Sequence, residues 1–124
     1  HVTAIARVPE DAVIDLYRRH DVLLWTPTYE GFGLVLLEAM SQRMAVVATP
    51  IGCAPSLVRD GENGLVVPVR QPEATADAVE RLLDDASLRR RLGDAARAAV
   101  EEMTWRATAL KTLDVYARAA GRRK

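Results

Sequence analysis

The sequence predicts an α/β fold, a Rossmann-like parallel sheet with helices on both faces. Short apolar runs alternate along the chain with longer segments of helical character, as in proteins built from successive strand–helix units. The runs at 22–26 and 45–48 are almost continuously apolar, which is typical of strands buried on both faces of a parallel sheet. Ligands of such sheets bind beyond the carboxyl ends of the strands, so the loop after residue 26 is the first candidate site.

The first half of the chain is predicted to hold three strands and two helices. The first helix opens at Pro9 with acidic residues in its first turn and closes on a basic run, so both ends suit the helix dipole. The second helix is apolar almost all round and is therefore expected to be buried. In order, the predicted elements are a strand at 2–6, a helix from 9 to about 20, a strand at 22–26, a helix from 34 to about 42 and a strand at 45–48.

The second half is predicted to hold one strand and three longer helices. Residues 60–64 (Asp-Gly-Glu-Asn-Gly) are strongly turn-forming, and Ser87 and Thr104 are the expected caps of the last two helices. One face of the last helix is expected to join the core, and it carries Trp105, Ala109, Leu113 and Tyr116. In order, we expect a turn at 52–55, a helical turn at 56–59, a strand at 65–67 and helices from 72 or 73 to 84 or 85, from 87 to about 101 and over 105–120.

Composition excludes several classes of protein. Lysine plus arginine equals aspartate plus glutamate at 17 each, which argues against a strongly basic nucleic-acid binder, and the basic tail at 122–124 is expected to be a solvated end. Cys53 is the single cysteine, so no internal disulfide can form, which fits a cytoplasmic location. No apolar run approaches the roughly 20 residues of a membrane span, so any membrane association would need other parts of a longer protein. The chain opens on His1 directly before a predicted strand, and we expect 1–124 to be part of such a protein.

The loop after the second predicted strand combines features of an anion-binding site. Gly31 and Gly33 let the backbone approach a ligand closely, and the helix that follows offers unpaired N–H groups and a positive dipole end. Two carboxylates bracket this helix start: Glu30 precedes it, and Glu38 lies about 7 Å beyond Gly33 at roughly 1.5 Å per residue. A docked diphosphate would have a hydroxyl-binding carboxylate on each side, which matches the layout of a nucleotide sugar.

Simpler interpretations remain open for each of these residues. Glu30 could be an acid favoured by the helix dipole, and the two glycines could form only a tight turn. Glu38 lies in an apolar helix, where a carboxylate needs either a structural salt bridge or a polar ligand. Cys53 is expected to be a packed thiol, and no spacing of His, Cys or carboxylates suggests a metal or cofactor site.

At these residues the chain resembles the family-four retaining glycosyltransferases, which have the GT-B fold. The stretch from Glu30-Gly31-Phe32-Gly33-Leu34 to Glu38-Ala39-Met40 matches their paired-glutamate motif, with seven residues between the acids. The segments at 16–22, 45–49, 60–68 and 104–105 also resemble the family, so the resemblance covers nearly the whole chain. It implies that 1–124 is part of the nucleotide-sugar-binding domain and that the N-terminal acceptor-binding domain is absent.

The resemblance also implies a role for each matching residue. Glu30 would be the catalytic residue that contacts the transferred sugar near the reacting centre, and Glu38 would bind the ribose hydroxyls. The residues expected to bind the donor through their backbone are Gly31, Phe32, Gly33, Leu34 and Val35. The donor would be a nucleotide diphosphate sugar, bound without a metal or cofactor. The basic residues that grip the diphosphate lie upstream in the family, so this chain alone is expected to turn over no sugar.

The chain departs from the family at several positions, and other functions compete. Arg43 and Ala45 replace the usual glycine and proline, which affects packing, whereas Cys53 and Ser56 lie nearer the ligand side, where a change bears on the choice of donor. The family's last helix returns toward the N-terminal domain, so part of its apolar face could be exposed here. A non-catalytic nucleotide-sugar-binding or scaffold fragment is the first alternative, and a receiver-like interaction domain is another. A dinucleotide oxidoreductase is disfavoured because no complete glycine fingerprint is present.

Overall fold

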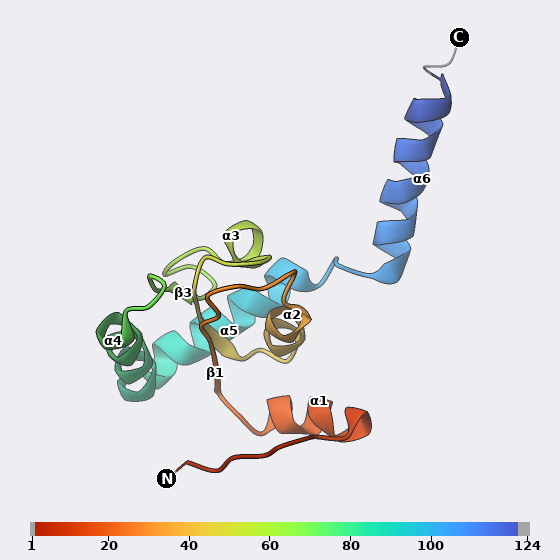
Figure 1. Ribbon diagram of the computed structural model, residues 1–124. Helices are drawn as coiled ribbons and strands as arrows, with labels where there is room; N and C mark the ends of the chain where they lie inside the picture. Colours follow the sequence, from red (N-terminus) through yellow and green to blue (C-terminus); the bar gives the residue numbers. More distant parts are fainter. Residues whose placement is uncertain (1, 122–124) are drawn as a thin grey trace.

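A computed structural model describes residues 2–121 and shows a three-stranded parallel sheet flanked by helices (Figure 1). The strands are β1 (Val22–Trp25), β2 (Ala45–Ala48) and β3 (Leu65–Val66), in the order β1-β2-β3. In the register of the sheet, Ala45 lies opposite Val22, and Val47 lies opposite Leu65. The predicted α/β class with a parallel sheet is confirmed. The predicted tail 122–124 lies outside the described residues.

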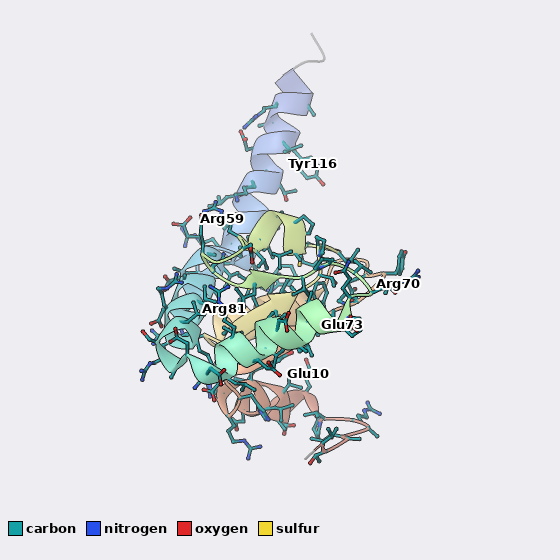
Figure 2. All side chains as sticks on the ribbon, turned by 90° about the vertical axis from the view of Figure 1, so that its left-hand side faces the viewer. Glu10, Arg59, Arg70, Glu73, Arg81 and Tyr116 are labelled. Carbon is teal, nitrogen blue, oxygen red and sulfur yellow. The ribbon has the colours of Figure 1, made fainter. Side chains whose placement is uncertain are left out.

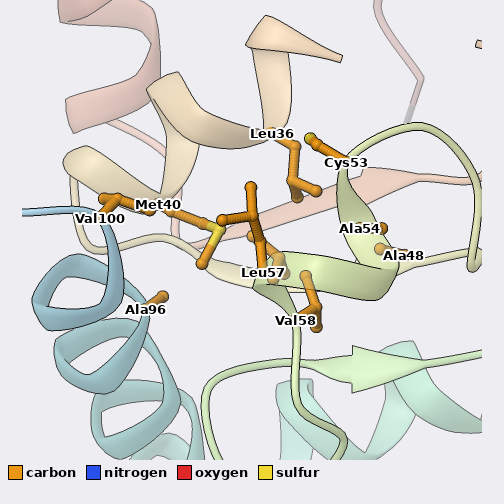
Figure 3. Packing of buried hydrophobic residues seen from close by; sticks show 10 residues of the cluster. Leu36, Met40, Ala48, Cys53, Ala54, Leu57, Val58, Ala96 and Val100 are labelled. Atoms are coloured by element: carbon orange, nitrogen blue, oxygen red, sulfur yellow. The ribbon is translucent and has the colours of Figure 1, made fainter. Parts of the chain in front are cut away.

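The helices lie on both faces of the sheet because β2 is apolar on both faces. They are α1 (Glu10–Arg18), α2 (Leu34–Ser41), α3 (Ala54–Leu57), α4 (Pro72–Asp84), α5 (Ala86–Val100) and α6 (Trp105–Gly121). One core cluster joins Val46 and Ala48 to residues of α2, α3 and the end of α5 (Figure 3). The other joins Ala45 and Val47 to β3, α4 and the start of α5. The alternation of side chains along β2 therefore anchors the two layers.

The packing of α5 against the rest of the core depends on a glycine. A Cβ built on Gly93 would lie 2.1 Å from the carbonyl oxygen of Arg43. This close approach brings α5 against the turn that leads from α2 into β2. Arg43 itself has a φ of 64°, a left-handed conformation that side chains rarely adopt, at a position where the resemblance leads us to expect glycine.

Side-chain caps test the predicted starts of the last two helices. Thr104 caps α6 as predicted, since its hydroxyl oxygen accepts a hydrogen bond from the Ala107 N–H. The predicted cap Ser87 is wrong, because the carboxylate of Asp85 accepts from the N–H groups of Ser87 and Leu88 and α5 begins one residue earlier. The helical turn expected at 56–59 is also wrong, since α3 spans 54–57.

Three predictions are wrong because the described structure lacks a neighbouring element that would cover or pair with the segment concerned. Residues 2–6 form no strand, because no described strand lies beside them to complete a ladder of hydrogen bonds. β1 is an edge strand of the described sheet, and Leu24 is therefore 50% exposed rather than buried. The last correction concerns α6, which extends away from the body with no buried residue, so its apolar face is not core (Figures 1 and 2).

Candidate functional site

The loop between β1 and α2 turns sharply at a glycine that no other residue could replace without movement. Gly33 has a φ of 97°, and a Cβ at this position would lie 2.6 Å from the indole ring of Trp25. Glycine alone adopts this left-handed conformation freely and leaves room for the ring. The Trp25 side chain thus packs under the turn and fixes where α2 begins.

Glu30 is held by the backbone of its own loop. One carboxylate oxygen, Oε1, accepts hydrogen bonds from the N–H groups of Gly31 at 2.9 Å and Phe32 at 3.4 Å. The side chain is half-buried and lies against the loop after β2, where a Cβ on Gly52 would be 3.1 Å from its Cγ. The loop therefore fixes the position of the predicted catalytic carboxylate before any ligand binds.

The loop after β2 closes the other side of this turn. The Cys53 N–H donates to the Phe32 carbonyl at 2.8 Å, and the Cys53 thiol donates to the Gly33 carbonyl at 3.6 Å. Burial is the main factor that raises the pKa of the Cys53 thiol, and the nearby charge of Glu30 raises it further. A thiol with a raised pKa is a poor nucleophile, so Cys53 is a packing residue, as the sequence predicts.

The first turn of α2 faces outward. Leu34 and Val35 are both exposed, whereas Leu36 is fully buried and donates its N–H to the Gly33 carbonyl. The first N–H groups of a helix have no partner within the helix and carry its positive dipole end. The sequence predicts that a diphosphate binds the N–H groups at this helix start, and this stays a prediction.

Glu38 lies on the outer side of α2, which corrects the expectation that this helix is buried all round. Leu36, Ala39 and Met40 form the buried side, and Glu38 is half-buried on the opposite side, one turn beyond Leu34. Its Oε2 accepts a hydrogen bond from the Tyr17 hydroxyl at 2.9 Å. Among residues 2–121, Glu38 takes part in no ion pair. The described residues therefore do not provide the structural salt bridge that was the alternative to a polar ligand.

Tyr17 is the residue of this site that sequence reasoning missed. It lies in the last turn of α1, 21 positions before Glu38, and no local pattern links the two. Burial, followed by the hydrogen bond and the negative charge of Glu38, raises the pKa of Tyr17 to about 12. The only available signal was indirect, since a carboxylate in an apolar helix needs a polar partner.

Two hollows flank the loop between β1 and α2. One, of about 490 Å³, lies at the carboxyl ends of the strands and is lined in part by Thr26, Thr28 and Arg70. The other, of about 750 Å³, lies between the start of α2 and α6 and contains Phe32 and Leu34. Phe32 and Leu34, which lie on either side of Gly33, thus line a surface hollow. Among the described residues, no cluster of three metal-ligating side chains is present.

Comparison with known proteins identifies the class of this chain. The family described as glycosyl transferases group 1 matches residues 1–99, and the chain belongs to that family. Over 113 residues it is 41% identical to a D-inositol 3-phosphate glycosyltransferase of Corynebacterium diphtheriae, a match that covers 90% of this chain and 26% of the relative. The chain thus spans about a quarter of the length of the curated relatives that it matches.

Two solved structures show the same fold. Sucrose-phosphate synthase from Thermosynechococcus elongatus superposes with a TM-score of 0.85 at 31% identity, over 96% of this chain and 30% of that protein. The HepE protein of Anabaena, solved with UDP and glucose, superposes with a TM-score of 0.65 at 28% identity, over 69% of this chain and 24% of that protein. Both likenesses support the predicted Rossmann-like class. In residues 2–121, no helix combines the length and apolar character that crossing a bilayer requires.

Proposed function

We propose that this chain binds the nucleotide diphosphate sugar donor of a retaining glycosyltransferase, at the start of α2. The observation that carries the proposal is the exposed first turn of α2, set by the left-handed Gly33, with a half-buried carboxylate on either side of it. Glu30 precedes this turn, and Glu38 lies on the same side of α2 as Leu34. A diphosphate on the helix end would then lie between two acceptors of hydroxyl hydrogen bonds.

Each part of the site has a distinct task in this proposal. The backbone of Gly31, Phe32 and Gly33 lines the pocket for sugar and phosphate, and the N–H groups of Leu34 and Val35 bind the diphosphate. Glu38 binds the ribose hydroxyls. Glu30 contacts the transferred sugar beside the reacting centre. The relative solved with UDP and glucose supports this division, since those two ligands are the nucleotide and sugar parts of such a donor.

We also propose how the reaction divides between this chain and the rest of a longer protein. The helix end stabilises negative charge on the leaving diphosphate without a metal, because the N–H groups of a first helical turn are fixed in direction before an anion binds. The acceptor would bind in a separate N-terminal domain, since this chain covers about a quarter of its curated relatives. Residues 1–124 would accordingly be part of the donor-binding domain. They would bind the donor but transfer no sugar alone, in a protein that acts in the cytoplasm.

Calorimetric titration with uridine, guanosine and adenosine diphosphates tests the proposal. We expect one of the three to bind, and Glu38→Ala to weaken that binding by about tenfold through loss of the ribose hydrogen bonds. Glu73→Ala is the matched control, because it removes an exposed carboxylate from α4, on another part of the surface (Figure 2). Equal affinity in the wild type and Glu38→Ala would contradict the proposal.

Titration with a nucleotide sugar distinguishes the role of Glu30 from that of Glu38. Glu30→Gln keeps an oxygen for the loop N–H groups but removes the charge that faces the sugar. We expect it to leave the affinity for the diphosphate unchanged and to remove the additional affinity for the matching nucleotide sugar. A variant that weakens both ligands equally would show that Glu30 acts only on the loop.

A further inference from the structure

The hydrogen bond between Tyr17 and Glu38 joins two helices at the proposed ribose end of the site. Tyr17 lies in the last turn of α1, and its hydroxyl donates to Oε2 of Glu38 at 2.9 Å. Both side chains are half-buried. A glutamate on the outer side of a helix has three rotatable side-chain bonds, and a hydrogen bond from a neighbouring helix selects one arrangement among them.

A second contact between the same helices separates this positioning from simple docking. The Arg18 guanidinium donates through Nε to Oε1 of Gln42 at 3.2 Å. Gln42 follows α2 and lies one turn beyond Glu38, farther from the loop between β1 and α2. The chain therefore attaches α1 to α2 at two points, of which only one involves the proposed ribose ligand.

We propose that Tyr17 is a positioning residue that holds Oε2 of Glu38 and leaves Oε1 as the acceptor for the ribose hydroxyls of the donor. Among residues 2–121, Oε1 has no hydrogen bond, whereas Oε2 is occupied by the phenol. The inference rests on the proposed function, because it assumes that Glu38 binds ribose. Without the phenol, the carboxylate would have to be ordered at the expense of ligand affinity.

The chemistry of the pair fits a fixed donor and a fixed acceptor. The pKa of Tyr17 is raised to about 12, first by burial and then by the hydrogen bond and charge of Glu38. The phenol therefore keeps its proton at neutral pH and donates a hydrogen bond to Glu38, whose second oxygen remains an acceptor. Ribose hydroxyls can donate to that oxygen, so the arrangement favours a ribonucleotide over an analogue that lacks these hydroxyls.

The test compares a nucleoside diphosphate with its 2′,3′-dideoxy analogue in calorimetric titrations of the whole chain. The ligand for this test is the nucleoside diphosphate, among those of uridine, guanosine and adenosine, that binds the wild type with the highest affinity. We expect Tyr17→Phe to weaken the ribonucleotide by about tenfold and the dideoxy analogue by less than about twofold. Phenylalanine keeps the ring, and circular dichroism melting verifies that the variant is folded.

Arg18→Ala is the matched control, because it removes the other contact between α1 and α2. We expect it to leave the preference for ribose unchanged. If Arg18→Ala lowers this preference as much as Tyr17→Phe does, docking of α1 is responsible and the positioning role is overturned. If Tyr17→Phe weakens both ligands equally, the role is also overturned.

The same titrations separate this inference from the proposed function. A wild type that prefers the ribonucleotide, loses the preference in Glu38→Ala and keeps it in Tyr17→Phe overturns the role of Tyr17 alone. A wild type with no preference, or no binding, overturns both statements. Loss of the preference in both Glu38→Ala and Tyr17→Phe, with retention in Arg18→Ala, supports both.

Discussion

The strand β2 and the helix α6 are both rich in apolar residues, yet they have opposite surroundings. All four residues of β2 are 0% exposed, and helices pack on both of its faces. None of the 17 residues of α6 is buried, and Trp105 is 92% exposed. The difference shows that an apolar face favours packing against another element. Whether the face is buried depends on which other elements are present.

The largest expected effect comes from the glycine that brings α5 against β2. Gly93→Ala would place a Cβ 2.1 Å from the Arg43 carbonyl, which is backbone and cannot rotate away. We expect a loss of about 4 kcal/mol in the free energy of unfolding, above the usual cost of overpacking. Urea denaturation measures it. Gly121→Ala in α6 is the control, because a Cβ there meets no atom within 4 Å and should cause no loss.

A pair of leucines tests the comparison directly. Leu92 is 0% exposed in α5, whereas Leu113 is 61% exposed in α6. We expect Leu92→Ala to lower the free energy of unfolding by about 3 kcal/mol, since it leaves a cavity between α5 and the sheet. Leu113→Ala should change it by no more than about 0.5 kcal/mol. Similar losses in both variants, measured by denaturation, would mean that α6 packs against the body in solution.

Two helix caps test the difference between a packed and an unpacked helix, with smaller expected changes in stability. The Asp85 carboxylate caps the packed helix α5, and the Thr104 hydroxyl caps the unpacked helix α6. We expect Asp85→Ala to lower global stability by about 1 kcal/mol, since α5 unfolds together with the core. Thr104→Ala should reduce the helix signal in circular dichroism without shifting the global unfolding transition. Ser87→Ala is the control, because Ser87 donates its backbone N–H to Asp85 and caps nothing.

The presence or absence of a packing partner also explains which parts of the fold can be predicted from the sequence. β2, α4 and the turn at 60–64 are confirmed because every partner that decides them lies within the chain. Residues 2–6, the exposed edge of β1 and the face of α6 were predicted from apolar pattern alone, and each lacks a partner in the described structure. Local pattern thus predicted element type better than it predicted burial.

The candidate site divides in a similar way. The glycine turn and the start of α2 follow from local sequence, because a left-handed glycine before an apolar helix is a short-range signal. The surroundings of Glu38 do not, because its partner Tyr17 comes from α1. Side-chain contacts between helices depend on how the helices cross, which no single segment encodes.

Tyr17 lies between the two extremes of burial, and the effect expected of its phenol proton is confined to alkaline pH. Its pKa in the folded chain is about 12, above the ordinary value of 10.0, so the unfolded chain loses the phenol proton at lower pH than the folded chain does. The contribution of this proton to stability is therefore complete below pH 10 and is lost as pH rises toward about 12. We expect denaturation midpoints of the wild type to fall more steeply over this range than those of Tyr17→Phe. If the midpoints of the wild type and Tyr17→Phe fall equally with pH, the phenol is exposed to water in the folded chain. In that case α1, like α6, does not pack against the core.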